Sequence, residues 1–204
     1  MTKLILVRHG ITEFNSARRF MGHSDVDLSA VGYSQVERLR DRLADEKIDA
    51  VYSSDLRRAL MTAEVISSGH KVNIVTCPEL REVNYGDAEG LTFEEIGHHH
   101  PGLARSITNF SLDLSFPGGE SFKDFTARTC QFLDRLNEYA LEQTILIVSH
   151  AGALRTLVCD LLGIDQSYWW KFRFDNASLS IVETHPRGAI ISLLNDTSHL
   201  RGIG

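Results

Sequence analysis

The chain has 204 residues, of which 43% are hydrophobic and 24% are charged. This length and balance fit one globular domain with a sizeable core. The formal net charge of −6 argues against nucleic acid or an anionic membrane as the main partner, because both bind basic surfaces. An acidic protein can still bind a phosphate through a local cationic pocket, so clusters of arginine and histidine are the features to look for.

The number and spacing of the cysteines indicate whether the protein resides in a reducing or an oxidising compartment. The three cysteines, Cys77, Cys130 and Cys159, are far apart in apolar surroundings, and none has a spacing typical of a zinc site. An odd number of scattered cysteines fits reduced thiols rather than a disulfide framework. The N-terminus leads straight into an apolar strand instead of a secretory signal, and no apolar run is long enough to span a bilayer. We expect a cytoplasmic protein.

The first part of the chain alternates predicted strands and helices. Apolar runs of four to six residues are typical of buried strands, and apolar positions three and four apart are typical of helices. In chain order we expect a strand over 3–8, a helix capped by Ser29, a strand over 50–53, a helix begun by Asp55 and closed near Gly69, and a strand over 72–76.

The second part begins with a segment rich in glycine and proline, at about 78–119, which we expect to be irregular and lid-like. The elements expected after it are a helix from Ser121 with a buried side that extends to Ala140, a strand over 145–148, a helix over 153–162, and strands over 179–183 and 189–194. This alternation predicts a single α/β domain: a three-layer sandwich with a mostly parallel central sheet, helices on both faces and an antiparallel edge.

Two of the predicted strands are continuous apolar runs that end near a histidine. The first runs into Arg8 and His9, and the strand over 145–148 leads to His150. Because the carboxyl ends of parallel strands share one edge of a sheet, we expect the two histidines to lie close together. Arg58 follows another strand, in the first turn of a helix, where a cation opposes the macrodipole but can hold an anion. The pattern predicts an anion site at this edge.

Five segments carry a resemblance to a known family: 8–15 (RHGITEFN), 53–59 (SSDLRRA), 80–86 (LREVNYG), 117–121 (PGGES) and 148–150 (VSH). They resemble the histidine phosphatase superfamily, also called the phosphoglycerate mutase-like family, and the first segment matches its RHGxTxxN signature. The NDTSHL near the end of the chain is similar to the alpha-ribazole phosphatase-like subgroup. The resemblance extends over essentially the whole chain and implies a phosphoglycerate mutase-like fold and a phosphatase.

The resemblance also implies roles for individual residues. His9 is expected to be the phosphorylated nucleophile and Glu82 the proton donor to the leaving oxygen. The expected phosphate pocket consists of Arg8, Arg58 and His150, with Asn15 and Thr12 as secondary contacts, Ala151 through its backbone N–H, and His199 at the substrate pocket.

These residue types suit the chemistry of a phosphate monoester. A neutral imidazole is not repelled by an anionic ester, and arginines disperse the charge of the transferring phosphoryl group. Neighbouring arginines would also lower the pKa of His9 and keep it neutral. A protonated carboxyl helps an alkoxide to leave. No metal or cofactor is needed for these steps. The triplet His98–His100 is interpreted as a solvated surface run rather than a metal site.

The resulting prediction is a metal-independent phosphomonoesterase that acts through a phosphohistidine on a small phosphorylated metabolite, with alpha-ribazole 5′-phosphate as the first substrate candidate. One alternative is a mutase that returns the phosphoryl group to a sugar-acid hydroxyl. Another is a non-catalytic binding protein on the same fold. The identity of the metabolite, a contribution of residues 84–120 to the pocket, and a homodimer through the edge strands or residues 168–174 are left open.

Overall fold

Six strands form one mixed sheet in the computed structural model, which describes residues 1–138 and 142–202. The strands are β1 (Thr2–Arg8), β2 (Ala50–Ser53), β3 (Ile74–Thr76), β4 (Thr144–Ser149), β5 (Leu179–His185) and β6 (Gly188–Asp196). Their order is β3-β2-β4-β1-β5-β6. The first four are parallel, whereas β5 runs antiparallel to β1 and β6 antiparallel to β5. The predicted parallel sheet with an antiparallel edge is confirmed.

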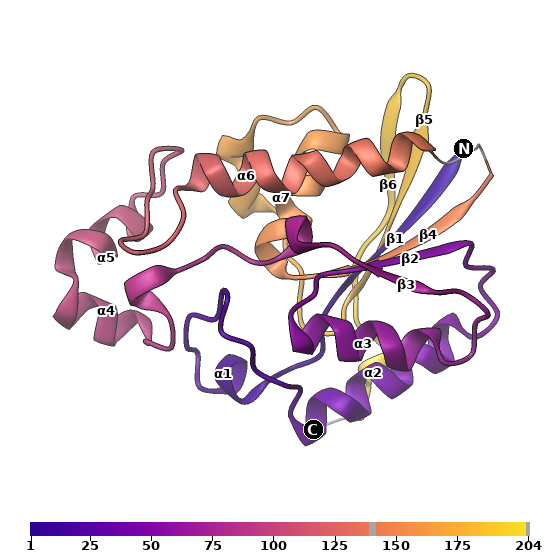
Figure 1. The fold of residues 1–204 in the computed structure, drawn as a ribbon, viewed down its shortest axis with the longest axis horizontal. Helices are drawn as coiled ribbons and strands as arrows, with labels where there is room; N and C mark the ends of the chain where they lie inside the picture. The colour runs from indigo at the N-terminus through magenta and orange to yellow at the C-terminus, as the bar shows by residue number, and fades with distance from the viewer. Residues whose placement is uncertain (139–141, 203–204) are drawn as a thin grey trace.

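Helices cover both faces of this sheet, as Figure 1 shows. They are α1 (Glu13–Ser16), α2 (Ala30–Leu43), α3 (Arg57–Ser67), α4 (Phe93–His99), α5 (Pro101–Thr108), α6 (Phe122–Gln131) and α7 (Ala151–Leu161). The pair α2 and α3 lies on one face, and α6 and α7 lie on the other, which is the predicted three-layer sandwich (Figure 1). Both α4 and α5 lie beyond the sheet, on the side of its carboxyl edge.

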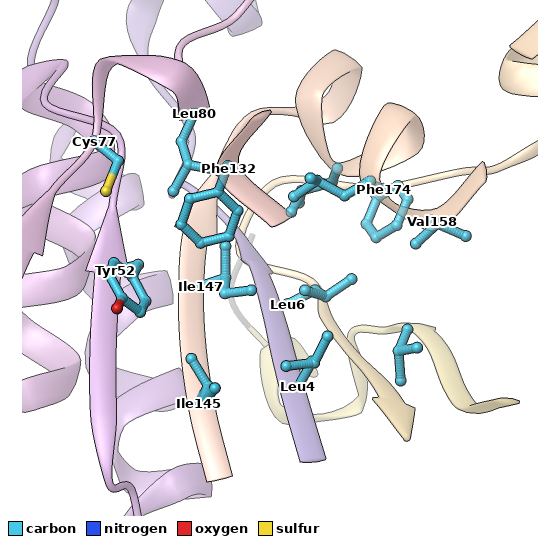
Figure 2. Close-up of a cluster of buried hydrophobic side chains, with 13 residues drawn as sticks. Leu4, Leu6, Tyr52, Cys77, Leu80, Phe132, Ile145, Ile147, Val158 and Phe174 are labelled. Carbon is cyan, nitrogen blue, oxygen red and sulfur yellow. The ribbon is translucent and has the colours of Figure 1, made fainter. Parts of the chain in front are cut away.

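The alternation of side chains along the central strands explains the layers. In β1, Leu4 and Leu6 belong to the core beneath α6 and α7, while Ile5 and Val7 belong to the core beneath α2 and α3. Successive side chains of a strand point to opposite faces, so a strand covered on both sides must be apolar throughout. Figure 2 shows the first of these cores, where Phe132 packs near side chains of β4 and β1.

The ends of several predicted elements differ in the structure. Asp55 does not cap α3, because its carboxylate pairs with the Arg81 guanidinium, and Leu56 at the cap position provides no side-chain hydrogen bond. The same helix ends at Ser67 with Ser68 at its C-cap, in agreement with the predicted end near Gly69. Predicted residue Ala140 lies outside the described residues. Ser121 caps α6 as predicted, accepting from the Asp124 backbone N–H.

The segment over 78–119 is more regular than predicted. It contains α4 and α5, and a separate apolar cluster joins them to the start of α6 and to α7 through side chains such as Ile96, Leu103 and Phe125. Thr92 caps α4 in a capping box with Glu95. The segment is therefore a packed helical layer, because its apolar residues find a core of their own.

Two observations bear on the environment of the protein. Cys77, Cys130 and Cys159 are all free thiols, and Cys77 and Cys159 are buried. Among the described residues, the helices are too short and too polar for any of them to cross a membrane.

Candidate active site

The two apolar strands place their histidines side by side. β1 and β4 pair with Arg8 opposite Ser149, and the His9 N–H donates to the Ser149 carbonyl at 3.0 Å. The ring centroids of His9 and His150 are 5.1 Å apart. His9 is 2% exposed and His150 is fully buried. The structure therefore brings together the two histidines that the sequence pattern placed at one edge of the sheet.

His9 is held as a neutral imidazole, and among the described residues its Nε2 has no hydrogen-bond partner. Burial lowers the pKa of His9 well below its ordinary value of 6.5, and the Arg58 and Arg8 guanidiniums lower it further. Its Nδ1 lies 2.7 Å from the Gly10 carbonyl oxygen. Since that oxygen can only accept, Nδ1 carries the proton and Nε2 keeps its lone pair. His9 also lines a cavity. Because its imidazole is neutral and Nε2 keeps a lone pair, the residue has the protonation state that a nucleophile needs.

Two arginines flank this imidazole, and each has donors to spare. Arg8 Nη1 donates to the Phe174 carbonyl at 2.8 Å, and Arg58 donates to the Ser24 and Gly22 carbonyls at 2.8 and 2.7 Å. Burial lowers the pKa of Arg58 to about 10, which leaves it cationic at neutral pH. In both arginines Nε is buried and has no hydrogen-bond partner among the described residues. Buried cations with unsatisfied donors form a site that can hold an anion.

Glu82 reaches the same cavity from another segment. Its Oε2 accepts from the Gly152 backbone N–H at 3.0 Å, at the start of α7, and its Oε1 accepts from the Val83 N–H at 3.1 Å. Both Glu82 and Ala151 line the cavity that His9 lines. The carboxyl group is therefore fixed by two backbone donors beside the imidazole.

His150 is buried just before α7. Burial lowers its pKa well below 6.5, and Arg58 lowers it further. Its Nε2 lies 2.9 Å from Ser54 Oγ, while Nδ1 is buried without a partner among the described residues. Ser54 belongs to the matched segment 53–59, but no role was predicted for it.

Asn15 and Thr12 form the capping box at the start of α1. Asn15 lines the cavity, whereas Thr12 is fully buried, and its hydroxyl contacts Asn15 Oδ1 and Met21 Sδ at 3.1 and 3.4 Å. The geometry makes Thr12 a residue that positions Asn15, not one that faces the cavity.

His199, which was predicted to line the substrate pocket, is not among the residues that line the cavity of His9. The last turn, Ser198–Leu200, packs against α2, and His199 Nε2 lies 3.0 Å from the Ala177 carbonyl oxygen. The Ala177 N–H in turn donates to the carbonyls of Arg8 and His9 at 3.1 Å each. His199 therefore lies behind the strand tip, because the terminal strand carries the chain past the site to the α2 side of the sheet.

The cavity has a volume of about 290 Å³ and is lined by Arg8, His9, Asn15, Arg18, Arg19, Phe20, Met21, Glu82, Tyr85 and Ala151. Tyr85 is the lining residue that comes from the open region 84–120. Arg18, Phe20 and Tyr85 were not predicted, although Tyr85 lies within the matched segment 80–86 and the other two follow shortly after the segment 8–15.

Asn176 was also missed. Its Nδ2 donates to the His9 carbonyl at 3.2 Å and to Asn15 Oδ1 at 3.1 Å, so one amide fixes two residues of the site. Nothing near Asn176 in the sequence pointed to this role. The contact forms because the segment that leads into β5 lies beside the end of β1, with which β5 pairs in the antiparallel direction.

Within residues 1–138 and 142–202, no group of three or more His, Cys, Asp or Glu side chains is arranged to hold a metal ion. His98 and His99 occupy the last turn of α4 and are exposed, as expected for a surface run.

The fold and the site together define a class: an α/β enzyme whose strand tips surround an anion pocket with a free imidazole nitrogen. A model of the histidine phosphatase superfamily (branch 1) matches residues 4–197. Phosphoserine phosphatase 1 of Hydrogenobacter thermophilus is 36% identical over 200 residues, which cover 98% of this chain and 95% of that protein. The chain therefore belongs to the histidine phosphatase superfamily.

Two further relatives agree with this assignment. The adenosylcobalamin/alpha-ribazole phosphatase of Escherichia coli K12 is 32% identical over 199 residues, which cover 95% of each chain. The crystal structure of the alpha-ribazole phosphatase from Shigella flexneri has a TM-score of 0.90 at 32% identity and covers 96% of each chain. The protein is accordingly a phosphoric monoester hydrolase.

Proposed function

We propose that the protein is a metal-independent phosphomonoesterase that acts through a phosphohistidine at His9 on a small phosphorylated metabolite. The observation that carries this proposal is the state of His9: neutral, with Nδ1 bound to the Gly10 carbonyl and Nε2 free in a cavity beside two arginines. A nucleophile of this kind needs no base to activate it.

In the first step, the Nε2 lone pair attacks phosphorus and forms a P–N bond. The ester P–O bond breaks, and its electron pair leaves on the alkoxide oxygen, which takes a proton from Glu82. Arg8 and Arg58 hold the phosphoryl oxygens and offset their charge, which supplies most of the catalysis in phosphoryl transfer.

In the second step, water attacks the phosphohistidine. Glu82 is now ionised and takes the proton of this water, the P–N bond breaks, and inorganic phosphate is released. The imidazole returns to its neutral form and Glu82 to its protonated form, so the cycle closes without a cofactor. Two guanidiniums do the charge stabilisation that a metal ion does in other phosphatases, and turnover is expected to survive dialysis against EDTA.

The test of the nucleophile is His9→Ala, with His98→Ala in the exposed triplet as the matched control. We expect His9→Ala to lower hydrolysis of an aryl phosphate by a factor on the order of 10³ or more, with unchanged far-UV circular dichroism, and to abolish the acid-labile phosphoenzyme seen after a rapid quench. The control keeps both signals. Undiminished turnover by His9→Ala refutes the assignment.

The acceptor of the phosphoryl group separates this proposal from the mutase alternative. A hydrolase releases one phosphate for each ester consumed. Net isomerisation of 3-phosphoglycerate that depends on a bisphosphate primer, with negligible free phosphate, would replace the hydrolase by a mutase. Binding of a phosphate ester without turnover in either assay would leave a non-catalytic binding protein.

The substrate is proposed by class: a small phosphate ester, since a cavity of about 290 Å³ is at the lower end of ligand-site volumes. Alpha-ribazole 5′-phosphate is one candidate, supported by the names of the E. coli and S. flexneri relatives, and phosphoserine is another, supported by the name of the H. thermophilus relative. The free thiols support a cytoplasmic location, and a homodimer stays a prediction that sedimentation would test.

A further inference from the structure

Arg18 occupies a backbone position that normally suits glycine. It follows α1 with a φ of 53°. The Arg18 N–H donates to the Asn15 carbonyl at 3.0 Å, and the Arg19 N–H donates to the Phe14 carbonyl at 2.9 Å. This pair of bonds is the Schellman ending of a helix, in which the left-handed residue is usually glycine because a Cβ is strained there. A strained residue at the mouth of an active site calls for a functional reason.

Arg18 lines the cavity that His9 and Glu82 also line. It is exposed, and among the described residues its guanidinium has no ion pair and no hydrogen bond. Its neighbour Arg19 differs, because Arg19 Nη1 is bound by the Glu95 carboxylate at 2.8 Å and by the Gly90 carbonyl at 2.6 Å. Among the described residues, Arg18 is therefore a cavity-lining cation whose whole guanidinium is available to a ligand.

A structural role alone does not account for Arg18. A cation at the C-terminal end of a helix interacts favourably with the helix dipole. However, α1 has only four residues, so its dipole is small, and glycine would complete the turn without strain. The place of Arg18 in the lining of the cavity, rather than the backbone turn, is therefore what favours arginine over glycine here.

The phosphate group of a substrate does not need Arg18, because other cations already balance its charge. Arg8 and Arg58 already match the two negative charges of a phosphate monoester, and Glu82 is held by backbone donors. We infer that Arg18 binds a carboxylate of the substrate, so that the preferred substrate is a short phosphomonoester that also carries a carboxylate, such as a phosphorylated hydroxy acid or hydroxyamino acid. This inference rests on the proposed function of the same site.

Size and chemistry favour a carboxylate on a short chain. A sphere of 290 Å³ is about 8 Å across, which fits a phosphate and a second anion a few bonds apart. The guanidinium fork matches the two oxygens of a carboxylate. Alpha-ribazole 5′-phosphate has no acidic group besides its phosphate, so Arg18 favours an acidic ester over that candidate.

The experiment compares two esters that differ by one carboxylate, O-phosphoserine and O-phosphoethanolamine. In the natural protein we expect kcat/KM to favour O-phosphoserine by about 10-fold, which is the usual contribution of a charged hydrogen bond that is open to solvent. Arg18→Gln and Arg18→Gly should each remove most of this preference, mainly through KM. Arg18→Lys should restore part of it, because the charge returns without the fork.

Arg38→Gln is the matched control, since Arg38 is an exposed arginine on α2 that does not line the cavity. It changes the net charge equally and should keep the preference. Arg18→Gly should also unfold in urea no earlier than the natural protein, because it removes the strained Cβ. This result separates a binding role from a folding role.

The possible outcomes distinguish the inference from the proposed function. Equal losses on both esters, or no loss on either, overturn the assignment of Arg18 to a carboxylate. A larger dependence on Arg18 for propane-1,3-diol bisphosphate than for O-phosphoserine overturns it in favour of a second phosphate. If the natural protein hydrolyses an aryl phosphate in a His9-dependent way but shows no preference within the pair, only the inference fails. If His9→Ala keeps full turnover, the proposed function itself fails.

Discussion

At the scale of single residues, the site depends on an imidazole that stays neutral among cations. His9 owes its lowered pKa first to burial and then to Arg58 and Arg8. In the proposed mechanism, the same two arginines that oppose a proton on His9 also attract the phosphate that His9 attacks. Because the bond to the Gly10 carbonyl fixes the tautomer, the reacting nitrogen is chosen before a substrate arrives. A change at either arginine therefore affects both substrate binding and the protonation of the nucleophile.

Glu82→Gln tests the second residue of the chemistry. The amide keeps the size of the side chain, and its one oxygen can accept from either the Gly152 or the Val83 N–H, which in Glu82 bind different oxygens. It cannot give up a proton to a leaving alkoxide. We expect kcat for alkyl phosphates to fall by about 10² to 10⁴-fold, the usual range for general acid catalysis. For p-nitrophenyl phosphate, whose leaving group needs no proton, the loss in the first step should be much smaller. Equal losses on both substrates, measured with pre-steady-state bursts, would show that Glu82 is not the acid.

The sequence predicted the residues of the chemistry better than the residues of the rim. His9 and His150 could be paired because each directly follows an apolar strand, and strand ends are readable from a hydrophobic pattern. Arg18 and His199 could not be placed in this way. The position of Arg18 depends on a backbone dihedral at the end of a very short helix, and the position of His199 depends on where the last strand leaves the sheet.

At the scale of elements, the start of α7 holds the carboxyl group in place. Gly152 donates its N–H to Glu82 Oε2, and a Cβ added at Gly152 would overlap Glu82 Oε1. The helix begins directly after His150, so one helix terminus positions two residues of the site. Glycine is required at this position by the close approach of the carboxyl group, and not by an unusual φ.

Gly152→Ala should therefore reduce activity while the helix remains intact. The added methyl group must displace the carboxyl group, and a misplacement of about 1 Å can lower the rate by about 100-fold. The matched control is Gly97→Ala in α4, where a Cβ meets nothing within 4 Å. The control should keep full activity and raise the free energy of unfolding by about 0.5–1 kcal/mol, since alanine is the better helix former.

Rates with an alkyl phosphate and urea unfolding curves measure both effects in this pair of variants. Full activity of Gly152→Ala would show that the carboxyl group can move without cost, and that its contact with α7 does not position it.

The short helix α1 was not predicted from the sequence, and neither was the pair of helices α4 and α5. The segment of α4 and α5 contains glycine and proline at intervals that are typical of loops, and this signal outweighed the Thr92–Glu95 capping box that begins α4. The capping box was readable in the sequence. The apolar cluster that stabilises these helices was not, since it forms only when the segment packs against α6 and α7. Asp55 failed as a cap for a similar reason, because its partner Arg81 comes from a distant segment.

At the scale of the whole molecule, segments that are far apart in the sequence close around two buried histidines. His9 follows β1, His150 follows β4, and the loop of Asn176 and Ala177 closes against the backbone of His9. Folding must therefore remove both imidazoles from water, and burial is the first cause of the low pKa of each. The stability of the fold is thus linked to pH through the residues of the site.

The direction of this dependence follows from proton binding. Both folded pKa values lie well below the ordinary value of 6.5, so below pH 6.5 the unfolded chain binds protons that the folded chain does not. Stability is then fully present above about pH 7.5 and falls as the pH drops through 6.5. Each buried histidine contributes a loss of at most about 1.4 kcal/mol per pH unit. The half-buried His23 and His199 also have lowered pKa values and act in the same direction.

Urea unfolding at pH 7.5 and 5.5 measures this loss, because the carboxyl groups with lowered pKa values titrate well below that window. We expect the free energy of unfolding to fall by about 2–3 kcal/mol between the two pH values, mostly from His9 and His150. His150→Gln should reduce the difference between the two pH values by about half, whatever its stability at pH 7.5, and His98→Gln on the surface should leave the difference unchanged. Equal stability of the natural protein at both pH values would mean that the imidazoles accept protons in the folded state, and the neutral nucleophile on which the proposed mechanism depends would be lost with it.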